Sequence, residues 1–242
     1  LFVIDAITSI ITATVVFRLI PETKPEQRPD HKPESLLDTL VGYRVVMADK
    51  LYMVFLIVSI LMLVVYQQMY STLSVYLRDV HGLPDRLYGL LLTLDAAVVV
   101  VLQFWVTRRI RDYSPMLMMA LGAFFYMIGF TMYGFVDTYA MFVLAILIIT
   151  AGEMIVVPVS QSIAARFAPE HMRGRYMAFF GLSWSLPSTI GPWAAGLIMD
   201  NYDPNWVWYA SGLLSIVAVS GFLALHLATR ERLATAPKAF EA

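Results

Sequence analysis

Asp95 and Glu153 are the residues whose positions point most directly to chemistry, because each lies well inside a long apolar stretch. At the helical rise of about 1.5 Å per residue, Asp95 would lie about 12 Å and Glu153 about 21 Å from the start of its stretch. An ionised carboxylate at the centre of a bilayer costs about 3 kcal/mol or more, so such residues usually face a bundle interior or a wet cavity. Burial also disfavours the charged form. We expect these acids to exchange a proton or to balance a cationic substrate. A permanent salt bridge or a protonated helix contact is the alternative.

Other polar side chains follow the acids at helical spacing. Positions three, four and seven apart share a helix face, so Thr150 and Ser160 form a stripe with Glu153. Polar stripes on apolar helices should face a cavity or another helix rather than lipid. We expect a substrate cavity lined by such residues, although backbone or interhelical hydrogen bonds are the alternative for the serines. Its predicted residues are Gln67, Tyr70, Ser71, Ser74, Gln103, Thr150, Ser160 and Trp184. Pro158 should bend the helix that carries Glu153.

The elements that position these residues are apolar stretches of membrane-spanning length. The chain is 59% hydrophobic and 14% charged, whereas soluble domains carry about 25% charged residues. A spanning helix needs about 17–25 apolar residues, and buried helices of a large soluble protein are disfavoured because the stretches have almost no polar face. The sequence therefore predicts an all-α, polytopic membrane bundle with spans at Leu1–Ile20, Tyr52–Leu77, Leu87–Thr107, Pro115–Val136, Tyr139–Ala165, Arg175–Met199 and Trp206–Ala228.

The positive charges assign a side to each connection. All of the 17 Lys and Arg residues except Arg78 and Arg86 fall in the first, third, fifth and last connections. Since cytoplasmic loops carry an excess of Lys and Arg, these connections and the C-terminus are predicted to be cytoplasmic. We expect an integral protein of the plasma membrane, in bacteria the inner membrane.

One connection, Pro21–Lys50, differs from the others. Its first part is rich in proline and charge and cannot bury a core, whereas Leu36, Leu37, Leu40 and Val41 could lie on one face of a short amphipathic helix on the membrane surface. The predicted organisation is a spanning helix (1–20), a cytoplasmic linker (21–50), a six-helix bundle (51–229) and a cytoplasmic tail (230–242).

Several kinds of chemistry have no signal in the sequence. There is no cysteine, and the four histidines (His31, His81, His171 and His226) do not have metal-ligand spacing. No phosphate-binding loop, dinucleotide fingerprint or nucleophile elbow occurs, and a net charge of −1 gives no sign of nucleic-acid binding. We expect no metal, no cofactor, no nucleic-acid partner and no enzymatic activity.

Two stretches carry a family resemblance: QQMYSTLSVYLRDVHGLPDRLYGLLLTLDA, which begins at Gln67, and GEMIVVPVSQSIAARFAPEHMRGRYMAFFGLSWSLPSTIGP, which begins at Gly152. They resemble helices seven to eight and ten to eleven of drug:proton antiporters in the major facilitator superfamily. The family's loop motif appears only in degraded form, as TRRIRDYSP. The resemblance implies that Leu1–Ile20 is helix six of a longer protein, whose N-terminal six-helix bundle is missing here. It also implies that the later spans form two three-helix units related by an inverted repeat.

The resemblance also implies a function. In that family, membrane-embedded carboxylates couple transport to protons, and cytoplasmic charges close an inner gate. The corresponding charges here are Arg108, Arg109, Arg111, Asp112, Arg173 and Arg175. We expect a secondary transporter that exports small amphipathic or cationic compounds against proton entry by alternating access, with Glu153 and Asp95 as coupling or substrate-binding groups. A proton-coupled uptake carrier for a sugar or metabolite is one alternative, and a non-transporting membrane receptor or scaffold is another.

Overall fold

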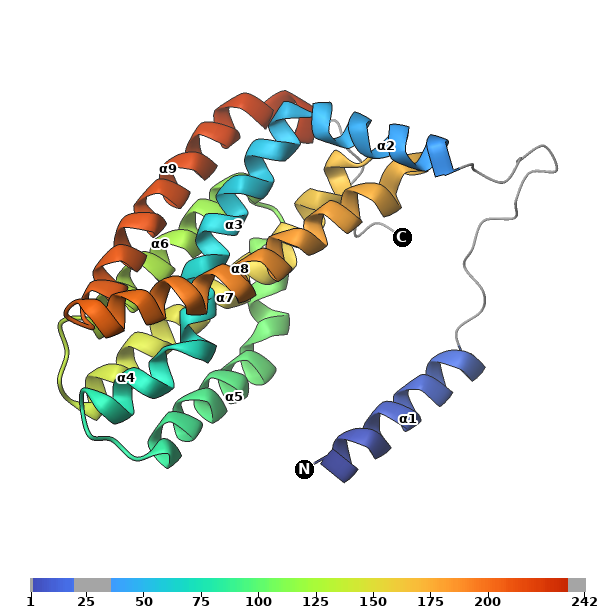
Figure 1. Cartoon of the computed structure of the whole chain (residues 1–242). Helices are drawn as coiled ribbons and strands as arrows, with labels where there is room; N and C mark the ends of the chain where they lie inside the picture. The colour runs from blue at the N-terminus through green and yellow to red at the C-terminus, as the bar shows by residue number, and fades with distance from the viewer. Residues whose placement is uncertain (1, 20–35, 235–242) are drawn as a thin grey trace. The chain divides into compact units, whose positions relative to one another are not determined.

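The computed structural model describes residues 2–19 and 36–234, and in these residues it contains helices and connecting turns without any strand. Residues 20–35, with the proline-rich part of the predicted linker, and residues 235–242 of the predicted tail lie outside the described residues. The chain divides into two units, Leu1–Thr39 and Leu40–Ala242. The helices are α1 (Phe2–Leu19), α2 (Leu36–Ala48), α3 (Lys50–Ser71), α4 (Leu73–Asp79), α5 (Asp85–Ile110), α6 (Pro115–Tyr133), α7 (Tyr139–Phe167), the short 3-10 helix η1 (Glu170–Met172), α8 (Arg173–Asn201) and α9 (Trp206–Ala234) (Figure 1).

Within the described residues, five helices are long and apolar enough to cross a membrane: α3, α5, α6, α7 and α9. This confirms the prediction of an all-helical membrane protein, and the five helices overlap five of the seven predicted spans. The other two predicted spans also form helices. The apolar part of α1, Ala6–Leu19, is shorter, and α8 is as long as α7 but less apolar, because hydroxyl side chains, glycines and two prolines interrupt it.

The predicted span Tyr52–Leu77 is not one continuous helix, because α3 ends at Ser71 and α4 begins at Leu73 (Figure 1). Thr72 lies at the junction, where its hydroxyl donates to Gln68 Oε1 over 2.6 Å. The Ser71 hydroxyl donates to the backbone oxygen of Gln67 over 3.0 Å. Hydroxyl groups that bond to the preceding turn often bend helices. The backbone N–H of Thr72 still donates to Gln68, so the chain bends here without reversing.

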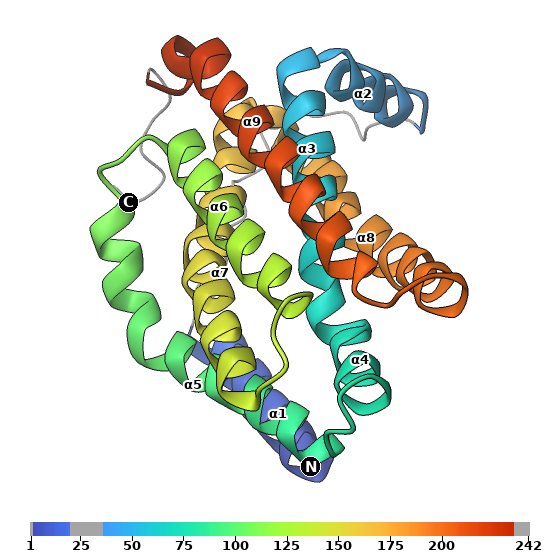
Figure 2. The same cartoon turned by 90° about the vertical axis from the view of Figure 1, so that its left-hand side faces the viewer.

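Six long helices pack in a pattern that has internal symmetry. Helix α6 packs along α7 and α9, α3 packs along α8 and α9, and α5 packs along α7 (Figure 2). If α3, α5 and α6 are exchanged with α7, α8 and α9 respectively, this set of contacts maps onto itself. If each of the six helices crosses the membrane, the second set of three starts on the opposite side of the membrane from the first. The contact pattern is the one expected of the predicted inverted repeat, which stays a prediction, and the two sets of helices share no obvious sequence identity.

Glycines allow α6 and α7 to pack very closely. A Cβ atom at Gly152 would lie 2.9 Å from the backbone oxygen of Gly122 and 2.9 Å from the ring of Tyr126. A Cβ atom at Gly129 would lie equally close to the backbone oxygen of Ala145. Small residues at helix interfaces in membranes permit this backbone approach. The close contact fixes α7, and with it Glu153, against α6.

An aromatic cluster closes the end of the bundle at the α4–α5 turn. Trp208 on α9 packs edge-on against Tyr76 and Tyr133, with ring centroids 5.1 and 5.0 Å apart. The Tyr76 hydroxyl lies within hydrogen-bond distance of two acceptors, Asn205 Oδ1 and the backbone oxygen of Tyr133, and it can donate to one of them at a time. His81 from the turn packs between Tyr76 and Phe142, 5.0 Å from each ring. This cluster ties the α4–α5 turn to α7 and α9.

Replacing Gly152 by alanine should destabilise the bundle. The added methyl group meets a backbone oxygen that can move only if α6 and α7 separate, and overpacking of this kind costs about 1–3 kcal/mol. The measurement is the thermal midpoint of the purified protein in detergent, followed by tryptophan fluorescence. Gly181→Ala is the matched control, because a Cβ atom at Gly181 meets nothing within 4 Å and alanine favours the helix. Equal midpoints for the two variants would contradict the close packing.

His81 should make stability depend on pH. Burial lowers the pKa of His81 below its usual value, and Asp137 opposes this effect. A group with a depressed pKa loses stability as pH falls, because the unfolded chain takes up its proton first, at about pH 6.5. The thermal midpoint should therefore decrease when the pH is lowered below about 6.5. Part of this decrease should disappear in His81→Phe, which keeps the aromatic packing. The exposed His171 supplies the control variant His171→Gln, whose pH profile should match that of the unaltered protein.

Candidate functional site

Helices α5 and α7 bring Asp95 and Thr150 together at buried positions. Asp95 is 6% exposed and Thr150 is fully buried. The Thr150 hydroxyl oxygen lies 2.6 Å from Asp95 Oδ1 and 2.7 Å from the backbone oxygen of Ile146. A hydroxyl has one hydrogen to donate, so it can donate to only one of these oxygens. If Asp95 carries a proton, the acid donates to Thr150 and the hydroxyl hydrogen remains for Ile146. The geometry thus accommodates Asp95 both with and without a proton.

Glu153 lies one turn further along α7 and is partly buried. Its Oε2 atom is buried and has no hydrogen-bond partner among the described residues. Asp95 and the Tyr66 hydroxyl interact electrostatically with its carboxyl group. A buried carboxylate oxygen without a partner is costly while the group is ionised. A proton or a bound cation would remove that cost.

Tyrosines from two other helices surround the two acids. Tyr66 on α3 stacks on Tyr126 of α6, with ring centroids 5.5 Å apart and an interplanar angle of 19°. The hydroxyl oxygens of Tyr66 and Tyr70 lie 3.0 Å apart. Trp184 of α8 meets the Tyr66 ring edge-on, with centroids 6.4 Å apart. Tyrosines of α3 and α6 therefore surround the carboxyl groups of α5 and α7, and Trp184 of α8 packs behind Tyr66.

Two members of this site, Tyr66 and Tyr126, were absent from the sequence prediction. A signal for Tyr66 existed, since it lies one turn before the predicted Tyr70 on the same helix face. Tyr126 is fully buried in an apolar helix, and its hydroxyl has no hydrogen-bond partner among the described residues. Buried tyrosine hydroxyls usually find a partner, so an isolated tyrosine inside an apolar stretch is itself a weak signal of a polar site.

Two of the remaining predicted cavity residues, Ser160 and Ser71, bond to the backbone of their own helices. The Ser160 hydroxyl donates to the backbone oxygen of Val157 over 3.1 Å, and Ser71 bonds in the same way to Gln67. Gln67 is partly buried where Gly191 of α8 packs on α3, and Ser74 is partly buried on α4. The adjacent Gln68, which was not predicted, is the more buried amide and donates to the backbone oxygen of Val64.

Gln103 has a specific partner at the proline of α7. In a helix, the carbonyl of Met154 would normally accept a hydrogen bond from the backbone N–H four residues later. Residue 158 is a proline and has no N–H, so the Met154 carbonyl lacks its usual donor. Gln103 Nε2 donates to this Met154 oxygen over 3.0 Å and to Thr107 Oγ1 over 2.8 Å. The amide of α5 therefore replaces the hydrogen bond that the proline removes. It holds α5 against α7 at the residue next to Glu153.

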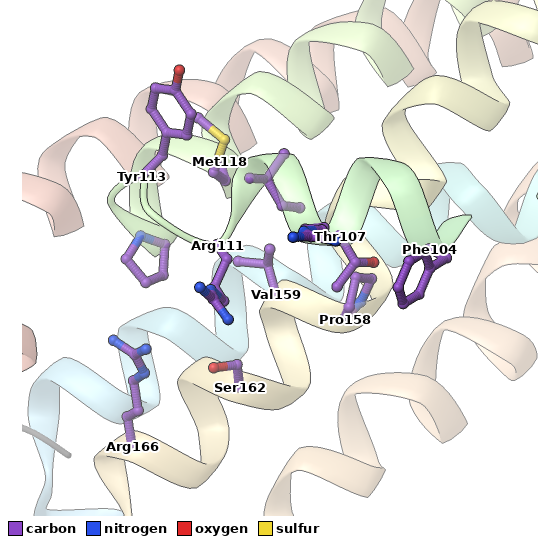
Figure 3. A pocket seen from close by; sticks show the side chains of 12 residues that line it. Phe104, Thr107, Arg111, Tyr113, Met118, Pro158, Val159, Ser162 and Arg166 are labelled. Atoms are coloured by element: carbon purple, nitrogen blue, oxygen red, sulfur yellow. The ribbon is translucent and has the colours of Figure 1, made fainter. Parts of the chain in front are cut away.

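The predicted gate residues are distributed over two places. Arg108 and Arg111 line a cavity of about 540 Å³ together with Arg166, which was not predicted. Figure 3 shows Arg111 and Arg166 pointing into this cavity from α5 and α7. Arg111 also lies 3.9 Å from the exposed Asp112.

The other gate residues lie outside that cavity. Arg109 is exposed at the end of α5, and Arg173 is exposed at the start of α8. Arg175 packs against Gly42 of α2, where a methyl group would overlap its guanidinium group. Beside this contact, Tyr43 of α2 packs on Phe179, with ring centroids 5.9 Å apart.

Comparison with known proteins identifies the relatives of the chain. The family model of the Major Facilitator Superfamily matches residues 1–192 and 155–242. The MFS-type transporter YqjV of Bacillus subtilis is 27% identical over 192 residues, which cover 78% of this chain and 47% of that protein. The Na(+), Li(+), K(+)/H(+) antiporter of Planococcus maritimus is 24% identical over 212 residues, with coverages of 80% and 48%. The chain thus spans about half the length of these relatives.

The fold has a counterpart among solved structures. The peptide transporter POT in complex with sulfate superposes with a TM-score of 0.62 at 20% sequence identity. The match covers 98% of this chain and 54% of the peptide transporter. At this level of identity the likeness establishes a shared helical transporter fold and carries no information on substrate.

The link between Gln103 and Pro158 can be tested with a double-mutant cycle. Gln103→Leu leaves the Met154 carbonyl without a donor and should destabilise the protein by about 1–3 kcal/mol. In a Pro158→Ala background the alanine N–H can donate to Met154, so the same change should cost clearly less. Thermal midpoints in detergent report both effects. Gln161→Leu, at an exposed position of α7, should be neutral, and equal losses from Gln103→Leu in both backgrounds would show that Gln103 does not replace the missing bond.

Proposed function

The chain belongs to the Major Facilitator Superfamily, and we propose that it is the C-terminal six-helix bundle of a proton-coupled transporter that exports small amphipathic or cationic compounds. In this proposal α1 is the last helix of a preceding bundle, and the spans from α3 to α9 form the second bundle. The pair of acids, a buried Asp95 and a partly buried Glu153 with tyrosines around them, is the observation that supports the proposal most strongly.

Proton coupling follows from the proximity of the two carboxyl groups. Two like charges in a poorly solvated site repel each other, so ionisation of one carboxyl group disfavours ionisation of the other. Asp95 interacts electrostatically with Glu153, and Thr150 offers Asp95 a hydrogen-bonded arrangement in either protonation state. The pair can thus take up a proton in one conformation of the transport cycle and release it in another.

Selectivity for a cationic or amphipathic compound follows from the aromatic side chains. The faces of tyrosine and tryptophan attract cations, and they also bind apolar groups. Tyr66 and Tyr70 interact electrostatically with Glu153, whose Oε2 atom has no hydrogen-bond partner among the described residues, and Trp184 packs against Tyr66. A cationic substrate and a proton would then compete for Glu153. Competition for one group produces exchange, with the proton entering as the compound leaves.

Alternating access requires an element that can change shape near this pair. Pro158 lies five residues after Glu153 inside α7, and discontinuous or bent helices mark the binding sites of many transporters. The bond from Gln103 to Met154 ties the bend to α5. We propose that a change of protonation at the acids alters the bend of α7 and thereby opens one side of the cavity.

The proposed orientation places the arginine-rich ends of α5 and α7 and the C-terminus in the cytoplasm, in a plasma or bacterial inner membrane. The exposed Arg109, Asp112 and Arg173 are then available for charge contacts with the N-terminal bundle that close the inner entrance. Arg175 would act through its contact with Gly42 of α2.

Exchange of monovalent cations for protons is a second candidate function. The relative from Planococcus maritimus carries the name of a Na(+), Li(+), K(+)/H(+) antiporter, and a small cation is one of the ligands that could satisfy Glu153 Oε2. The aromatic surroundings favour the larger substrate, because carboxylate, carbonyl and water oxygens, rather than aromatic rings, suit hard cations.

Replacing Glu153 by glutamine tests the proposal in the complete protein. Efflux of a lipophilic cationic dye into energised everted vesicles should fall at least about tenfold, and the remaining flux should lose its dependence on the proton gradient. The reason is that glutamine can neither carry a proton nor balance a cation. Asp85→Asn, which neutralises an exposed acid at the far end of α5, is the matched control and should leave efflux unchanged.

The same vesicles separate the alternatives. Coupled efflux that persists in Glu153→Gln with the same pH dependence would exclude the proton-carrying role. Substrate accumulation in the opposite direction would indicate the uptake carrier. Dissipation of the proton gradient on addition of Na(+) or K(+), without dye transport, would favour the cation exchanger. The absence of any flux would favour the receptor or scaffold.

A further inference from the structure

A second charged site lies at the cytoplasmic end proposed for α5 and α7, away from the acids. Glu153 and Arg166 are 13 residues apart on α7, which corresponds to about 20 Å along a helix. Arg108, Arg111 and Arg166 line the same cavity of about 540 Å³. This volume lies in the range of ordinary ligand sites, about 300–1,000 Å³. The site is thus separate from the proposed transport site.

The arginines have little compensation for their shared positive charge. None of the described residues that line the cavity is acidic, and the Nε atom of Arg166 is buried without a hydrogen-bond partner among the described residues. The acidic side chain nearest to Arg111 is Asp112, at 3.9 Å, and both side chains are largely exposed. Three cations around one cavity, with two hydroxyl groups from Thr107 and Ser162 on its walls, form a set of donors suited to a phosphate group.

The rest of the cavity and its surroundings are apolar. Phe104, Met118, Pro158 and Val159 line its walls (Figure 3). Next to it, α5 exposes an apolar ridge that includes Val100, Val101, Phe104 and Trp105, with 73–82% of each side chain exposed. The cavity lies at the end of α5, a helix long and apolar enough to cross a membrane, and the end of such a helix is expected at the level of the lipid headgroups. The ligand that fits all three features is an anion with a long apolar tail.

We propose that this cavity binds the phosphate group of an anionic phospholipid, whose acyl chain lies along the exposed ridge of α5. Basic pockets between spanning helices at the cytoplasmic surface bind anionic headgroups in this way. Arg111 and Arg166 hold the phosphate from opposite walls, and the lipid bridges α5 to α7 beyond the Pro158 bend. This inference uses the proposed orientation only for the leaflet concerned and does not depend on proton coupling.

Native mass spectrometry of the complete, purified protein tests the proposal directly. The probes are phosphatidylglycerol and phosphatidylcholine, added at matched concentrations to delipidated protein. The unaltered protein should retain phosphatidylglycerol in preference to phosphatidylcholine. The double variant Arg111→Gln/Arg166→Gln should bind phosphatidylglycerol at least about tenfold more weakly, because it loses two charge-assisted contacts. The control Arg86→Gln/Arg173→Gln removes the same charge at exposed positions and should retain the preference.

Further measurements exclude the other occupants of the cavity. If the test and control variants lose phosphatidylglycerol equally, the binding is non-specific and the proposal is wrong. If inorganic phosphate competes fully at equal concentration, the site recognises a free anion and not a lipid. The variant Phe104→Gln keeps the arginines and should weaken lipid binding alone. The double variant Arg111→Gln/Arg166→Gln could lower the thermal midpoint in phosphatidylcholine nanodiscs and leave the retention of phosphatidylglycerol unchanged. That result would show that an acidic side chain of the protein fills the cavity, and the proposal would be wrong.

Discussion

The contact between α5 and α7 is the interaction on which the rest of this structure depends. In a bilayer every buried polar group must find its hydrogen-bond partner within the protein. This contact supplies partners for a buried carboxyl group and for a backbone carbonyl that lacks its helical donor. Thr150 faces Asp95 at one level, and Gln103 caps the carbonyl freed by Pro158 at another. An acid and a proline would each weaken an isolated apolar helix. Across this interface their costs are offset by side chains from the neighbouring helix.

The symmetry of the bundle shows how one architecture carries two kinds of chemistry. Exchange of the two three-helix units places the α5–α7 contact on the α8–α3 contact. The latter contains Gln68, its hydrogen bond to Thr72 and the close approach of Gly191, and both carboxyl groups lie at the former. The packing is thus shared by the two contacts, whereas both carboxyl groups lie at one of them, with Asp95 on α5 and Glu153 on α7. A bundle built in this way can repeat one packing arrangement while a single one of the two equivalent contacts carries the titratable groups.

Charge is arranged along α7 in a definite order. The acid Glu153 comes first, the bend at Pro158 follows, and Arg166 lies near the end of the helix. The acidic site is polar, aromatic and buried, whereas the arginine site opens at the end of the membrane-spanning region. Because Pro158 lies between them, a ligand at either site would influence the same bend. In our proposals a proton and substrate act on one side of it and an anionic lipid on the other.

The sequence by itself determined the class of the protein and its most informative residues. Apolar stretches of spanning length specify helices, because no other open structure satisfies the backbone in lipid, and a carboxyl group within such a stretch stands out against its surroundings. That argument found Asp95, Glu153 and the polar stripe with Thr150.

The sequence could not decide which helices meet, since periodicity gives a helix its faces but does not identify the neighbour of each face. Only the tertiary structure placed Tyr66 and Tyr126 beside Glu153, gave Gln103 its partner at Met154, and joined Arg166 to Arg108 and Arg111. Each of these contacts links residues far apart in the chain, so it depends on how the helices pack and not on the spacing of residues within any one of them.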